Sequence, residues 1–233
     1  MIETLNRGVS PRRTASQLRV AMVLAAAASG TAGAGDLRVA VVDARGQPAV
    51  QVVVLARPVG NVMAAASAKS VTVTQQMQSF TPSVTPISVG TTVQFPNLDR
   101  MRHHVYSFSQ AKTFEIHLYS GEEIPKVTFD VPGPVSLGCN IHDWMSGYLY
   151  VTDAPYFAST DGSGNAALGN LPPGEYRLSV WHPKLNAETA AGTTQVGAAA
   201  ATADIKVAAT IETLAQHRPD DDPLLLRLRA QNN

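Results

Sequence analysis

Four side chains in the middle of the sequence have the types and spacing of a metal site. The segment LGCNIHDWM holds the only cysteine of the chain, Cys139, and His142 and Met145 follow it at intervals of three. Upstream, the segment RHHVYSF offers an imidazole from His103 or His104. A thiolate and two imidazoles in one plane, with a weak axial thioether, form the copper site that transfers single electrons. The residues therefore predict one mononuclear copper site.

Strands and a tight loop must position these donors. A strand that starts near Val135 is expected to end at Cys139, and the sheet resumes after Gly147 with the segment YLYV. The loop between them returns the other two downstream donors to the same ion. Successive side chains of a strand point to opposite faces, so adjacent His103 and His104 are not expected to bind one ion together.

The segment resembles the cupredoxins, the family of plastocyanin, pseudoazurin and amicyanin. Its VQFPNLDRMRHHV stretch aligns with the strand that ends in the family's first ligand histidine, and Cys-x-x-His-x-x-Met has the short amicyanin-type loop. The resemblance implies a type 1 copper site with the ligands His103, Cys139, His142 and Met145. His104 stands where the family has an asparagine that ties the ligand loops together. It is therefore expected to orient the ligand loop, or to be the alternative ligand if the register is shifted.

Each residue alone has a simpler interpretation. Cys139 could be a small buried hydrophobe, Met145 a core filler and His142 a solvated loop residue. Their joint occurrence in this order, beside the FPN and HHV motifs, favours a metal site. His117 is interpreted as a surface histidine, and His182 as a residue that packs or bonds locally.

Strand signals dominate the rest of the chain. Short segments rich in Val, Thr, Tyr and Phe are separated by Gly, Pro, Asp and Asn, and no amphipathic helix of normal length is present. This pattern predicts an all-β protein built of sandwiches or barrels. The cupredoxin resemblance implies that one of them is a Greek-key β-sandwich.

Two segments that flank the copper segment look like parts of one module. Residues 36–58 and residues 155–217 together resemble the carboxypeptidase-regulatory-like, transthyretin-like β-sandwich. The cupredoxin domain, residues 67–153, would then be inserted at an exposed loop tip of a split domain. In the alternative, the flanks pack on the middle domain as extra strands. The tail, residues 218–233, has no clear assignment.

The N-terminus has the pattern of a secretory signal peptide. In residues 1–34, basic residues precede an apolar run, and small residues follow it, so cleavage after Ala34 is expected. A membrane anchor is the alternative, but the uncharged stretch 20–35 is only partly apolar, and a span needs about 20 predominantly apolar residues. We expect an exported, periplasmic protein without a transmembrane segment in its mature form.

Charge and motifs exclude several functions. Residues 1–34 hold four of the 18 basic residues and one of the 18 acidic residues, which leaves 14 basic against 17 acidic residues and argues against binding to nucleic acid. No Ser-His-Asp pattern, His-Glu-x-x-His helix or Gly-rich phosphate loop is present. The six histidines do not readily supply the second copper centre of an oxidase or a nitrite reductase. The sequence predicts no enzymatic activity.

The resemblance implies a blue copper electron carrier that shuttles electrons between a redox protein donor and an acceptor. The whole chain is also similar to exported plastocyanin-like proteins often called methylamine utilisation proteins. An alternative is a copper-binding carrier or storage module on an envelope-associated β-scaffold. A third possibility is an adhesion or assembly module that carries a degenerate cupredoxin, but the complete donor set argues against it.

Overall fold

A computed structural model describes residues 34–60, 70–212 and 214 of the 233-residue chain. These residues form β-strands arranged in several sheets and contain no helix, so the prediction of an all-β fold is confirmed. Accordingly, no helix in the described part of the chain is long and apolar enough to cross a membrane. The expected signal peptide, except for its last residue, and the tail lie outside the described residues.

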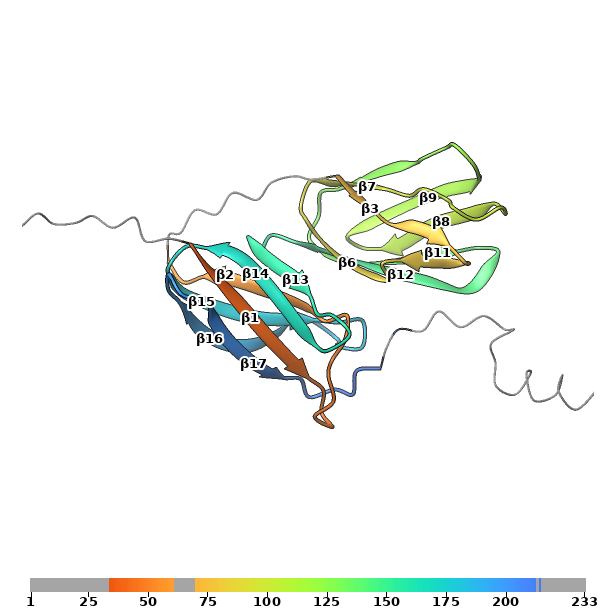
Figure 1. The fold of residues 1–233 in the computed structure, drawn as a ribbon. Coiled ribbons are helices and arrows are strands. Elements are labelled where there is room, and N and C mark those ends of the chain that lie inside the picture. Colours follow the sequence, from red (N-terminus) through yellow and green to blue (C-terminus); the bar gives the residue numbers. More distant parts are fainter. Residues whose placement is uncertain (1–33, 61–69, 213, 215–233) are drawn as a thin grey trace, which may run out of the picture. The chain divides into compact units, whose positions relative to one another are not determined.

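Two sheets are built from strands near both ends of the described chain (Figure 1). The first has the order β14-β1-β17, with β1 (Gly35–Val42), β14 (Asn165–Leu171) and β17 (Ala201–Lys206). The second has the order β13-β2-β15-β16, with β2 (Val53–Pro58), β13 (Tyr156–Ser159), β15 (Gly174–Trp181) and β16 (Thr189–Val196). Strand β1 pairs antiparallel with β14 and parallel with β17, so segments far apart in the sequence lie side by side.

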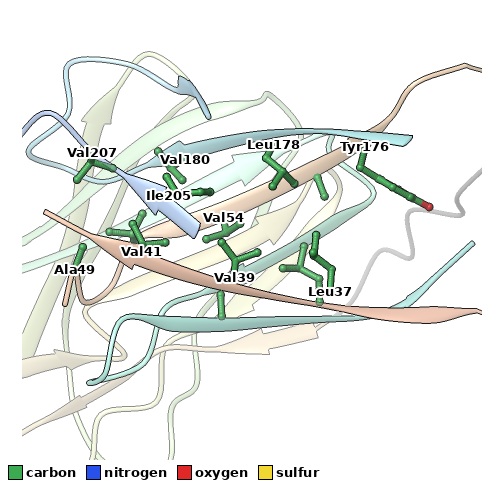
Figure 2. Packing of buried hydrophobic residues seen from close by; sticks show 14 of the residues in the cluster. Leu37, Val39, Val41, Ala49, Val54, Tyr176, Leu178, Val180, Ile205 and Val207 are labelled. Carbon is green, nitrogen blue, oxygen red and sulfur yellow. The ribbon is translucent and has the colours of Figure 1, made fainter. Parts of the chain in front are cut away.

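A shared apolar core holds these two sheets together. Leu37, Val39 and Val41 alternate with more exposed residues along β1, as expected for a strand with one buried face. Figure 2 shows their side chains meeting those of Val54 and Leu178, which come from the other sheet. Burial of one such side chain contributes about 1.5–3 kcal/mol. The boundaries of a split domain stay a prediction, although strands from both flanks share this core.

The strands between the flanks form a second set of sheets, which carries the candidate site. A five-stranded sheet has the order β6-β12-β11-β8-β9, with β6 (Val84–Ser88), β8 (His103–Ser109), β9 (Lys112–Tyr119), β11 (Gly133–Cys139) and β12 (His142–Thr152). A three-stranded sheet has the order β10-β7-β3, with β3 (Ser70–Thr72), β7 (Thr91–Gln94) and β10 (Lys126–Phe129). A short ribbon pairs β4 (Thr74–Gln76) with β5 (Ser79–Thr81). Their separate core includes Phe95, Phe129 and Leu149, all fully buried.

His182 follows β15 and is fully buried. Its Nδ1 accepts a hydrogen bond from the Lys184 N–H at 3.1 Å, which confirms the prediction that this histidine bonds locally. Its Nε2 is buried without a hydrogen-bond partner in the described part of the chain. Burial, helped by the charge of Lys184, lowers the pKa of His182 to about 4.

The low pKa of His182 should make the folded protein sensitive to acid. Because the folded pKa is about 4 and the ordinary value is 6.5, its contribution to stability is complete above pH 6.5 and is lost as the pH falls toward 4. The total loss is about 3 kcal/mol, at 1.36 kcal/mol per pKa unit. Urea unfolding at pH 7 and pH 4.5 should show a smaller acid effect in His182→Asn, which keeps an acceptor for Lys184. An equal acid effect in both proteins would contradict this assignment.

Candidate metal centre

Three neighbouring strands of the five-stranded sheet bring three of the predicted donors together. His103 opens β8, Cys139 ends β11, and His142 opens β12. Strands β11 and β12 are joined by a tight turn, and their pairing shifts register between Gly138 and Cys139, where Cys139 comes opposite His142. The turn therefore places a thiol and an imidazole beside the start of β8.

The donor atoms of these three residues face one another. Cys139 Sγ lies 3.8 Å from His103 Nδ1 and 3.7 Å from His142 Nδ1, and the centroids of the two imidazole rings are 5.0 Å apart. One donor atom from each of the three residues lies within 4.8 Å of the others. His103 and Cys139 are almost completely buried, and His142 is the most exposed of the three. Three potential ligands thus converge on one point.

These distances fit a metal ion in the plane of the three donors. Metal bonds of about 2.3 Å to sulfur and about 2.0 Å to nitrogen, at trigonal angles, put the sulfur about 3.7 Å from each nitrogen. Met145 is buried in the same apolar cluster as Cys139, and both line one cavity. A thioether there is suited to the role of a weak axial donor.

Asp99 determines which nitrogen of His103 is free to bind a metal. The His103 Nε2–H donates to Asp99 Oδ2 at 2.8 Å, so Nδ1 is the ring nitrogen that faces the sulfur. The carboxylate is itself held by the backbone N–H groups of Met77 at 2.7 Å and Gln78 at 2.8 Å. A carboxylate behind a ligand histidine fixes its orientation and raises its basicity.

The sequence patterns assign Asp99 no role. The signal was present, because Asp99 lies four residues before His103 within the quoted segment PNLDRMRHH. Spacing alone does not reveal the contact, however, because it forms through a loop and not within a strand.

Electrostatics favours the thiolate form of Cys139, which a metal needs. Burial raises the pKa of the Cys139 thiol, but hydrogen bonds and the charge of His103 outweigh burial and lower it below its ordinary value. Burial likewise lowers the pKa of His103, but hydrogen bonds with Cys139 and Asp99 outweigh it and raise the pKa. The thiolate form, which is the metal ligand, is therefore favoured.

Two backbone N–H groups and the imidazole of His142 also surround the Cys139 sulfur. The N–H groups of His104 and Ile141 donate to the Cys139 sulfur, which also lowers the pKa of the thiol. The pKa of His142 is lowered by burial and by the nearby charge of His103, so this ring stays neutral and can offer a lone pair. Trp144 lies edge-on against His142, with ring centroids 5.1 Å apart.

The side chain of His104 lies elsewhere. Its Nε2 is 2.9 Å from Glu115 Oε1 on β9, and its ring lies beside those of Tyr106 and His117. The structure therefore groups His103, and not His104, with the cysteine. His104 contacts the sulfur through its main chain, whereas its side chain bonds to β9. The assignment of His103 as the ligand stays a prediction.

Comparisons with known proteins give a partial structural likeness. A scan with protein-family models and a search of curated proteins find no match for this chain. Among solved structures, the chain is similar to a Cu-containing nitrite reductase, to amicyanin and to a purple cupredoxin.

Three of these structures illustrate the likeness. The Cu-containing nitrite reductase NirK from Thermus scotoductus SA-01 is 30% identical, with a TM-score of 0.35, over 42% of this chain and 25% of the reductase. An oxidised amicyanin mutant is 18% identical, with a TM-score of 0.33, over 44% of this chain and 99% of amicyanin. A purple cupredoxin from Nitrosopumilus maritimus is 22% identical, with a TM-score of 0.32, over 37% of this chain and 100% of that protein. The chain thus spans about a quarter of the nitrite reductase.

Proposed function

We propose that this protein is a periplasmic electron carrier with one type 1 copper site, bound by His103, Cys139, His142 and Met145. The observation that carries the proposal is the convergence of Cys139 Sγ with two imidazole nitrogens at 3.7 and 3.8 Å. Copper held by such donors changes between two oxidation states with little rearrangement. The proposed role is to pass single electrons from a redox protein donor to an acceptor, without turnover of a substrate.

The residues of the chain have distinct tasks in this proposal. Cys139 supplies the anionic donor, and the two N–H groups that reach its sulfur spread the thiolate charge. Asp99 holds His103 in one tautomer, so that the ring does not reorient when the charge of the site changes. His142 is the most exposed of the three grouped donors, and its ring is the proposed route for electrons to and from the partners.

A spectrum and a voltammogram of the copper-loaded protein test this function. We expect an intense visible charge-transfer band, an electron paramagnetic resonance signal of a type 1 site, and a reversible one-electron couple with fast self-exchange. A coloured protein with sluggish, irreversible electron transfer would instead favour the copper-carrier or storage function. A protein that is colourless when loaded with Cu(II) would contradict both the site and the proposal.

Met145→Leu tests the axial position. The substitution nearly conserves volume in a buried position, so its cost in stability should stay below about 1.5 kcal/mol. Loss of an electron-donating thioether should favour the reduced form, so cyclic voltammetry should show a higher reduction potential while the visible colour remains. An unchanged potential would exclude Met145 as the axial donor.

A further inference from the structure

A second group of possible ligands lies outside the site described above. His104 comes from β8, and Glu115 and His117 come from β9, the edge strand of the five-stranded sheet. Residues two apart on a strand share a face, so Glu115 and His117 lie on the same side of the sheet. The pairing of β8 with β9 shifts register between His103 and Val105, at the position of His104. The register shift occurs where the side chain of His104 lies close to those of Glu115 and His117.

The three side chains meet at one carboxylate oxygen. Glu115 Oε1 lies 2.9 Å from His104 Nε2 and 3.6 Å from His117 Nδ1, and one donor atom of each residue lies within 4.8 Å of the others. Metal bonds of about 2.0–2.1 Å at tetrahedral angles separate neighbouring ligand atoms by about 3.4 Å. The two separations from Glu115 Oε1, 2.9 and 3.6 Å, bracket this value.

A simple ion pair explains less of this geometry. Separate contacts of Glu115 with His104 and with His117 account for each distance alone, whereas one shared ion accounts for the convergence of both imidazoles on a single oxygen. His104 is 6% exposed, and its Nδ1 is buried without a hydrogen-bond partner in the described residues, so Nε2 is the nitrogen that it offers to the group. Glu115 and His117 are largely exposed, which leaves room for water on a bound ion.

We propose that His104, Glu115 and His117 form a second metal site for a divalent transition-metal ion such as Zn²⁺. Two imidazoles and one carboxylate, with an open position for water, are a donor set that such ions accept. This site shares no side chain with the proposed copper site and does not depend on that proposal. The second site is nevertheless linked to the copper site, because His104 follows His103 in the chain. The backbone N–H of His104 also donates to the Cys139 sulfur.

Calorimetric titration of the full chain with Zn²⁺ tests this site. The Cys139→Ala background removes the thiolate, the anionic donor of the first group, and so weakens its competition for the metal. In this background we expect one bound Zn²⁺, and His117→Ala or Glu115→Gln should each weaken binding by at least about 10-fold, the minimum typical of disturbing a metal site. Glu122→Gln changes another exposed glutamate, which lies outside the group, and should bind Zn²⁺ like the background.

Each result of the titration has a clear meaning. Absence of Zn²⁺ binding in the Cys139→Ala background would overturn the second site, and so would undiminished binding in either His117→Ala or Glu115→Gln. Loss of folding does not confuse the result for His117→Ala, because the His117 side chain is 88% exposed, and thermal unfolding without metal should match that of the background. Failure of the copper proposal would leave the titration unaffected, since no copper is added.

Discussion

Cys139→Ser should abolish the visible band of the copper-loaded protein. The band depends on the covalent bond between thiolate sulfur and Cu(II), and a serine hydroxyl stays protonated and does not replace it. We expect more than about 100-fold weaker copper binding, because loss of a ligand should exceed the 10–100-fold effect of changing a residue that only bonds to a ligand. Absorption spectra and copper titrations of the two proteins measure both effects.

The control for Cys139→Ser is a measurement of whether the metal-free variant is folded. Serine has nearly the size of cysteine and enters a position that is 2% exposed, so circular dichroism should show an intact fold. Met145→Leu is the matched ligand variant and should keep its colour. A Cys139→Ser protein that stays coloured would show that the chromophore is not the thiolate site.

A pair of variants decides which of the adjacent histidines is the ligand. His103→Ala should bleach the protein or leave an open site that added imidazole refills, because the lost ring is the one whose Nδ1 faces the sulfur. His104→Asn should keep the colour and change copper affinity or potential modestly, since the main-chain N–H that reaches the sulfur remains. Visible spectra after copper loading, with and without imidazole, compare the two variants.

The reverse outcome is equally informative. If His104→Asn bleaches the protein and His103→Ala does not, the ligand is His104. The hydrogen bond between His103 and Asp99 then does not serve to orient a copper ligand. Asp99→Asn provides a further control, because it keeps the side-chain shape and removes the anionic acceptor of the His103 N–H. It should keep the colour with lower copper affinity, by about 10 to 100-fold.

Local patterns predicted most of the candidate site. Cys139 and His142 are three residues apart across one turn, so their proximity follows from the chain itself, and strand alternation correctly separated the side chains of His103 and His104. The all-β fold followed from short Val- and Thr-rich segments between turn residues. These predictions do not depend on which strands pair.

The remaining contacts depend on pairing that the sequence does not reveal. His117 was interpreted as a surface histidine, and it is exposed, but its approach to His104 depends on the register of β8 and β9. A shift of one residue would turn it to the other face. The bond between Asp99 and His103 depends in turn on a loop conformation held by two backbone groups, which no periodicity encodes.

The parallel pairing of β1 with β17 has a consequence for the order in which the chain folds. Strand β17 (Ala201–Lys206) completes a sheet that β1 (Gly35–Val42) begins, so this sheet cannot be finished until nearly the whole chain has been synthesised. The strands around the candidate metal site all lie between Ser70 and Thr152 and can pair earlier. Contacts between distant segments slow folding because the intervening loop must close first. The sandwich of the flanks should therefore be the slower part to fold and the longer exposed to aggregation.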